Sequence, residues 1–129
     1  MLSRHGMIQS DGKLLTGGAL ADGFFCAPII GEAPLDYRLW REEKFVTIVL
    51  VGEVDSLDEA IERANSSEYG LTAGFYGGSD EVESFLSRIE AGVTYVNRPQ
   101  GATTGAWPGF QPFGGWKGSG TKGKAIGSF

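Results

Sequence analysis

Glycines near the end of the sequence have the spacing of two phosphate-binding motifs. Gly118, Gly120 and Gly123 match the dinucleotide fingerprint G-x-G-x-x-G, and the run from Gly115 to Lys122 resembles a P-loop whose lysine is displaced by one residue. Both motifs need a strand before the glycines and a helix after them, so that backbone N–H groups point at the phosphate. Here the preceding "GATTGAWPGFQPFGG" is typical of a loop. The residues alone therefore disfavour both phosphate sites and leave a glycine-rich tail.

Four other side chains have the chemistry of a catalytic or binding group. His5 lies near the N-terminus, and we expect a surface residue, because a general base needs a positioned neighbour. Cys26 lies between Phe25 and Ala27 in a predicted strand, which offers no cationic group to activate a thiol, so it is predicted to be a small core residue. Glu42 and Glu43 are adjacent, and such a pair is most often solvated.

The hydrophobic pattern predicts an α/β fold. Residues 47–54, "TIVLVGEV", are β-branched and apolar, as in a strand buried on both faces. Ser56 and Glu59 then have the spacing of a helix capping box. Further strands are predicted at 13–18, 24–30, 71–76 and 93–97, and helices at 56–64 and from about 79 to a stop at Gly92. The order β-α-β-α-β from residue 47 implies a mainly parallel sheet.

Each predicted helix carries an apolar face at helical spacing. The first is formed by Leu57, Ala60, Ile61 and Ala64, and the second by Val82, Phe85, Leu86 and Ile89. Between the early strands and residue 47, part of "EAPLDYRLWREEKF" is predicted to be helical. The loop after the last strand, residues 98–113, is long, and such loops at the ends of parallel strands commonly carry binding sites.

Composition limits the classes of function. The formal charge of −5 argues against nucleic acid and against an anionic membrane surface as partners. No apolar run is long enough to span a bilayer, and the first residues contain no apolar signal region. A single cysteine excludes an internal disulfide and a cysteine-cluster metal site, so we expect a cytoplasmic location and no metal.

Three ordered segments resemble one protein family. "WREEKF" (residues 40–45), "ANSSEYGLTAGFYGGS" (64–79) and "AGVTYVNRPQGATTGAWPGFQPFGGWKGSG" (91–120) are similar to the C-terminal part of an aldehyde dehydrogenase catalytic domain. Within that superfamily the last segment most resembles the 1-pyrroline-5-carboxylate dehydrogenases, which oxidise glutamate 5-semialdehyde to glutamate in proline catabolism. The resemblance divides the chain into strands and a connecting segment (1–46), the β-α-β-α-β region (47–97), and a substrate loop with a glycine-rich tail (98–129).

The resemblance implies a role for five residues in a complete enzyme. Glu43 would bind the nicotinamide ribose hydroxyls of NAD or NADP, and Phe45 would flank the same ring. Gly105 and Ala106 would bind the carboxylate end of the aldehyde substrate, and Phe113 would line the tunnel. The resemblance also implies that the final glycines form tight turns beside that tunnel and bind no phosphate.

The same resemblance implies that parts of the enzyme lie upstream of this sequence. These are the nucleophilic cysteine, the glutamate general base and the Rossmann domain, so we expect no activity and no tight cofactor binding from the chain alone, and pairing with the missing part or self-association. Lys44, Val46 and Thr47 depart from the usual E-E-x-F-G-P motif. The alternative is a non-catalytic relic that acts as a self-associating or binding module.

Overall fold

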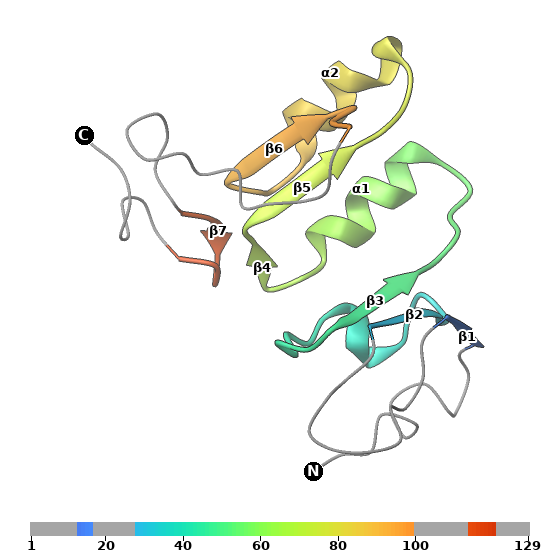
Figure 1. Ribbon diagram of the computed structural model, residues 1–129. Helices are drawn as coiled ribbons and strands as arrows, with labels where there is room; N and C mark the ends of the chain where they lie inside the picture. The colour runs from blue at the N-terminus through green and yellow to red at the C-terminus, as the bar shows by residue number, and fades with distance from the viewer. Residues whose placement is uncertain (1–12, 17–27, 100–113, 121–129) are drawn as a thin grey trace. The chain divides into compact units, whose positions relative to one another are not determined.

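The computed structural model describes residues 13–16, 28–99 and 114–120 of the chain (Figure 1). The elements belong to two compact units, Met1–Glu53 and Val54–Phe129. The first contains a three-stranded sheet, and the second contains two helices with two short strand pairs. The described helices are too short and too polar to cross a membrane.

The sheet of the first unit has the order β1-β2-β3. β1 (Lys13–Thr16) is antiparallel to β2 (Ile29–Glu32), which is parallel to β3 (Ile48–Val51). Residues 24–27 of the strand predicted at 24–30 lie outside the described part of the chain. The described strand β2 continues two residues beyond that prediction, and all four of its residues pair in register with β3. The helical segment predicted before β3 is one 3-10 turn, η2 (Arg38–Trp40).

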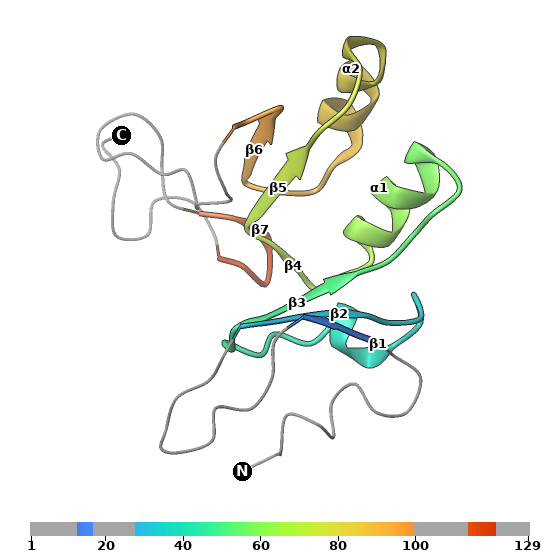
Figure 2. The ribbon, with the colours of Figure 1, turned by 45° about the vertical axis from the view of Figure 1, so that its right-hand side comes forward.

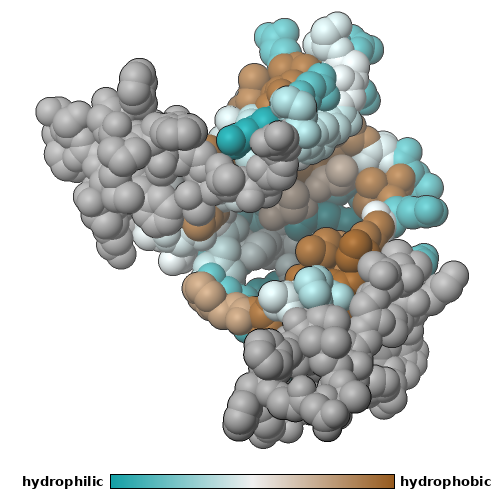
Figure 3. Space-filling model, in the orientation of Figure 1, coloured by the Kyte–Doolittle hydropathy of each residue, from teal (hydrophilic) through white to brown (hydrophobic). Residues whose placement is uncertain are grey.

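β3 is partly buried on one face and exposed on the other, so the prediction of burial on both faces is wrong for this structure. Ile48 packs with Leu39 against the buried Ile29. The opposite face carries Val49 and Val51, which are 58% and 42% exposed. The one-turn η2 covers the first face, and the described residues of this unit leave the second face open. Hydrophobic surface is visible around β3 in Figure 3.

The second unit confirms the predicted order of helices and strands. α1 (Leu57–Asn65) is followed by β4 (Tyr69–Gly70), β5 (Thr72–Phe75), α2 (Ser79–Arg88) and β6 (Val93–Val96). β5 and β6 are parallel, with α2 as their connection (Figure 2). The last strand, β7 (Trp116–Lys117), pairs antiparallel with β4.

The predicted capping box forms at the start of α1, with one difference. The Ser56 hydroxyl accepts a hydrogen bond from the Glu59 N–H at 3.2 Å. The Glu59 carboxylate accepts from the N–H of Asp55, one residue before the cap, also at 3.2 Å. The same carboxylate accepts from Arg63, and this hydrogen bond lowers the pKa of Glu59 below its ordinary value of 4.5. The first turn is therefore stabilised by local polar contacts, in addition to the packing of Leu57 against the core.

The core of this unit lies between the helices and one face of the β5–β6 pair. Ile61 of α1 is buried with Phe85 and Ile89, and the ring of Phe85 stacks on Phe75 at 5.2 Å. Leu86, predicted to lie on the apolar face of α2, is 47% exposed, so that part of the prediction is wrong. Ala64 is also exposed. α2 ends at Arg88, before the predicted stop at Gly92, because Ile89 turns to an extended backbone as its side chain enters the core.

Candidate functional site

The described glycines near the C-terminus pack against the protein's own backbone. The N–H of Gly118 donates to the Glu68 carbonyl at 2.8 Å, and that of Ser119 donates to the Trp116 carbonyl at 3.1 Å. The N–H of Gly115 donates to the Gly120 carbonyl at 3.3 Å. Because these donors are used within the protein, they are not presented to a phosphate, as the fingerprint would require.

Close approach explains the glycine at position 115. A Cβ atom there would lie 2.5 Å from the Cβ of Ser119 and 2.9 Å from the Gly70 carbonyl oxygen, which is closer than real Cβ contacts. The segment therefore docks on β4 through its backbone. Gly123, the third glycine of the fingerprint, lies outside the described residues.

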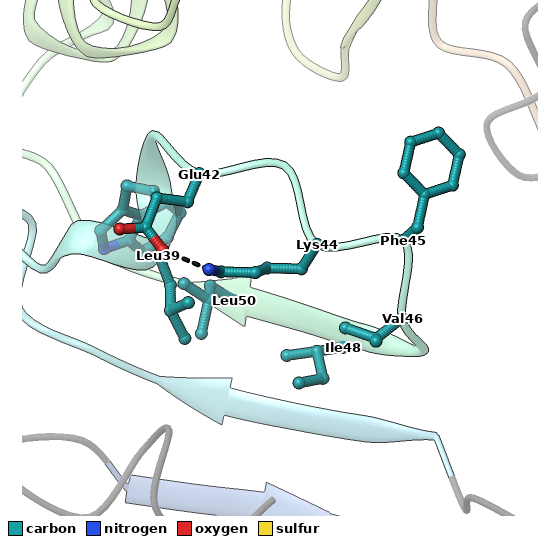
Figure 4. Close-up of a pocket in the computed structure, with 8 residues that line it drawn as sticks. Leu39, Glu42, Lys44, Phe45, Val46, Ile48 and Leu50 are labelled. Carbon is teal, nitrogen blue, oxygen red and sulfur yellow. Dashed lines mark ion pairs between the residues drawn. The ribbon is translucent and has the colours of Figure 1, made fainter. Parts of the chain in front are cut away.

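The turn between η2 and β3 surrounds a hollow of about 270 Å³ (Figure 4). Its lining is mostly apolar with one pair of opposite charges, and consists of Leu39, Trp40, Glu42, Lys44, Phe45, Val46, Ile48 and Leu50. The wall is formed by η2, the turn and β3, which are neighbours in sequence. The hollow therefore belongs to the first unit alone.

The two adjacent glutamates of this turn have different surroundings. The Glu42 carboxylate pairs with Lys44 and with Arg38, at 3.2 Å from the guanidinium. The hydrogen bond from Lys44 lowers the pKa of Glu42, and the two cations keep it ionised. Glu43 is exposed, and the described residues provide it with no hydrogen bond or ion pair that would compete with a ligand.

Phe45 is directed outward from the same turn. Its backbone has a φ of 42°, which is uncommon for a bulky residue, and its side chain is 92% exposed. In Figure 4 the ring points away from Leu39 and Leu50. Glu43, predicted to bind the ribose hydroxyls, and Phe45, predicted to flank the nicotinamide ring, thus lie two positions apart on one exposed turn.

The predicted substrate residues Gly105, Ala106 and Phe113 lie outside the described residues, as do His5 and Cys26. Among the residues that are described, no group of histidine, cysteine, aspartate or glutamate side chains has the geometry to hold a metal ion. The structure does describe the exit from β6, where Asn97 takes a left-handed backbone with a φ of 50°.

Two polar residues that the sequence interpretation missed organise this unit. Asn97 pairs its side-chain amide with the backbone of Gly77, and Lys117 pairs with Glu90. An asparagine directly after a predicted strand was the available signal for the first, since asparagine tolerates a left-handed backbone. No local pattern indicates the role of Lys117, because its partner Glu90 is far away in the sequence.

Comparison with known proteins gives one consistent family. The sequence model described as "Aldehyde dehydrogenase family" matches residues 5–128. A 1-pyrroline-5-carboxylate dehydrogenase of Bacillus licheniformis is 42% identical over 124 residues, and one of Bacillus pumilus is 39% identical over 123 residues. Each alignment covers 92% of this chain and 23% of the relative. The chain therefore spans about a quarter of the length of these relatives.

A solved structure supports the fold. The 1-pyrroline-5-carboxylate dehydrogenase from Thermus with bound NAD superposes with a TM-score of 0.82 at 36% identity. The match covers 93% of this chain and 24% of that protein. The mixed α/β arrangement described above is thus the arrangement of the corresponding stretch of that enzyme.

Proposed function

This chain belongs to the aldehyde dehydrogenase family, and from that premise we propose that it forms part of an NAD- or NADP-dependent enzyme that oxidises glutamate 5-semialdehyde to glutamate in proline catabolism. The observation that carries the proposal is the identity of 42% to a 1-pyrroline-5-carboxylate dehydrogenase over nearly the whole chain. The chain would contribute cofactor and substrate contacts to that enzyme. The nucleophile and the general base would come from the remaining three quarters of such a protein.

Glu43 is proposed to bind the ribose hydroxyls next to the nicotinamide. A carboxylate accepts hydrogen bonds from two vicinal hydroxyls at once, and this orients the attached ring. The described surroundings of Glu43 support the role, because Glu42 is engaged by Arg38 and Lys44 and Glu43 is not. Phe45, exposed on the same turn, offers an apolar ring to the nicotinamide. When bound, the cofactor would accept a hydride from the aldehyde carbon.

The proposed contacts with the substrate are assigned to residues that follow β6 in the sequence. Glutamate semialdehyde carries a carboxylate and an ammonium at the end opposite the aldehyde, and a buried carboxylate needs hydrogen-bond donors. Gly105 and Ala106 would supply backbone N–H groups without a bulky side chain in the way. Phe113 would contact the aliphatic part of the substrate. Family resemblance supports these three assignments.

The partner of the chain is proposed to be the upstream part of the enzyme or another copy of the chain. The open face of the first sheet, with Ile30, Val49 and Val51 exposed, supports an apolar contact there. The same observation favours the second candidate function, a non-catalytic module that self-associates. A cytoplasmic location and the absence of nucleic-acid partners stay predictions from the sequence.

The proposal is tested by completing the enzyme. The upstream region of the Bacillus licheniformis relative is fused to this chain at the start of the aligned stretch, and NADH or NADPH formation is measured with glutamate 5-semialdehyde. The upstream region alone and the 129-residue chain alone are the controls. Turnover by the fusion and by neither part supports the proposal. A folded fusion that reduces no cofactor, together with self-association of the 129-residue chain, supports the non-catalytic module instead.

A further inference from the structure

We propose that Asn97 is a positioning residue: its side-chain amide clasps the backbone of Gly77 and so fixes the direction in which the chain leaves β6 toward residues 98–113. The inference rests on the proposed function, because it assigns that loop to the substrate. Its geometric basis lies entirely in described residues.

Asn97 makes three hydrogen bonds across the ends of two strands. Its Oδ1 accepts from the Gly77 N–H at 3.0 Å, and its Nδ2 donates to the Gly77 carbonyl at 3.0 Å. Its backbone N–H donates to the Phe75 carbonyl at 2.7 Å. The side-chain amide is therefore bound to Gly77, just after β5, and the backbone donor is bound to Phe75, the last residue of β5.

The side-chain amide of Asn97 extends the hydrogen bonding between β5 and β6 beyond the point where their backbone pairing ends. The parallel pairing of β5 and β6 ends at Phe75 opposite Val96. At the next residue the main chain of Asn97 turns away with a φ of 50°. A side-chain amide carries a carbonyl acceptor and N–H donors, as a peptide group does, so it can take the place of the lost pair at Gly77. The strand ends stay joined while the main chain changes direction.

Asparagine satisfies all of these requirements. It tolerates the left-handed backbone and supplies both a donor and an acceptor. Glycine at position 97 would allow the backbone but lose the clasp. Ionised aspartate would keep the acceptor for the Gly77 N–H and place a negative oxygen near the Gly77 carbonyl. Gly77 itself is confined, since a Cβ there would lie 2.6 Å from the Phe75 ring.

The location of the clasp indicates why it matters. β5 and β6 point the same way, so their carboxyl ends meet at one edge (Figure 1). Loops that leave this edge of a parallel sheet are the usual carriers of ligand contacts. Gly105 is eight residues beyond Asn97 in the sequence. A change of direction at the start of such a loop moves everything that follows, whereas a change in the middle can be absorbed locally.

Asn65 provides a matched control within the same unit. Its Nδ2 donates to the Arg88 carbonyl and its Oδ1 accepts from the Glu90 N–H, both at 2.8 Å. The chemistry is the same, an amide that bridges two backbone groups. Asn65, however, joins the end of α1 to the end of α2 and does not precede the loop.

The first measurement uses the 129-residue chain itself. Asn97→Gly and Asn65→Ala are compared with the unchanged protein by amide hydrogen exchange and by limited proteolysis. We expect Asn97→Gly to speed exchange at Gly77 and cleavage within residues 98–113, with exchange at Ile61 and Phe85 unchanged. Asn65→Ala should leave cleavage there at the rate of the unchanged chain. Unaltered cleavage in Asn97→Gly, or loss of protection throughout both units, would overturn the inference.

The second measurement uses the fusion enzyme of the preceding section. Loss of two hydrogen bonds in Asn97→Gly is expected to raise KM for glutamate semialdehyde about tenfold. KM for propanal and for the cofactor should stay within about twofold, since neither needs the amino-acid end of the site. Equal losses on both aldehydes would assign Asn97 a general structural role and contradict the inference. A fusion with Asn97 intact that oxidises no aldehyde counts against the proposed function. In that case hydrogen exchange and proteolysis of the 129-residue chain still test whether Asn97 fixes the direction of the chain after β6.

Discussion

Lys117 and Glu90 form an ion pair between residues 114–120, here called the glycine segment, and the connection that leads from α2 to β6. The same ammonium donates to the carbonyl oxygens of Asn65 and of Ser67, the latter at 3.2 Å. The backbone of Lys117 meanwhile pairs with Tyr69 in the β4–β7 ladder and has a left-handed φ of 53°. One lysine thus ties the glycine segment to the C-terminal end of α1, where a positive charge is favourable.

Replacing Lys117 by methionine should destabilise the second unit by about 1–2 kcal/mol, because the ammonium satisfies several oxygens at once. Lys44→Met is the matched control, since the ammonium of Lys44 pairs with the single carboxylate of Glu42 on an exposed turn. Urea unfolding followed by circular dichroism measures both variants. Equal midpoints for the two would show that the lysine at position 117 adds no more than an ordinary surface pair.

Glu43→Gln in the fusion enzyme should raise KM for the cofactor at least tenfold, because each charge-assisted hydrogen bond contributes about 1.5–3 kcal/mol. Glu42→Gln at the adjacent position is the control, and it should change this KM little, since the Glu42 carboxylate pairs with Arg38 and Lys44. Steady-state kinetics with varied NAD and NADP decide the matter. A larger effect at Glu42 would transfer the ribose contact to that residue.

Gly105→Val should separate two aldehydes in the fusion enzyme. A side chain at this position is expected to obstruct the carboxylate end of glutamate semialdehyde and to spare propanal, so kcat/KM should fall for the first substrate only. Gly101→Val, in the same loop but nearer β6, is a control for steric change in general. The same loss on both aldehydes, or none on either, would remove the proposed carboxylate contact.

The contribution of Glu59 to stability should depend on pH. The hydrogen bond from Arg63 lowers its pKa in the folded chain below the ordinary 4.5, so the folded state favours the ionised carboxylate. The stabilisation is then complete above pH 4.5 and is lost as the pH falls through the lower folded-state pKa. Unfolding of Glu59→Gln and of the unchanged chain should differ most at neutral pH and converge in acid. Glu62→Gln, exposed on the same helix, controls for loss of charge. A difference that grows toward acid would reverse the assigned sign.

The open face of the first sheet should drive association of the 129-residue chain. Lysine at both Val49 and Val51 is expected to shift the chain toward monomer, since charges on this face oppose apolar contact. Leu86→Lys is the control, because Leu86 is a comparably exposed residue on α2. Light scattering over a range of concentrations measures the mass. A monomer at every concentration before mutation would contradict the expected self-association.

Local signals in the sequence accounted for the elements and their order. The capping pair Ser56 and Glu59 predicted the start of α1 correctly, because such contacts involve residues three apart. Hydrophobic periodicity located α2 and the strands on either side of it, and the motif around Gly115 indicated the family. The same periodicity misassigned Leu86, since an apolar residue at the edge of a helical face is buried only if a neighbour reaches it.

By itself the sequence determined the α/β order, the family and which residue types could meet a cofactor or a carboxylate, because these depend on short-range patterns. Only the tertiary structure decided which of these residues already have partners within the protein. Arg38 and Lys44 pair with Glu42 and not with Glu43. One face of β3 is exposed although its residues are apolar. Gly77, the partner of the Asn97 side chain, lies 20 residues away, and Ser67, one of the partners of Lys117, lies 50 residues away. Contacts at such separations depend on how strands and helices pack, and no local pattern of residues specifies them.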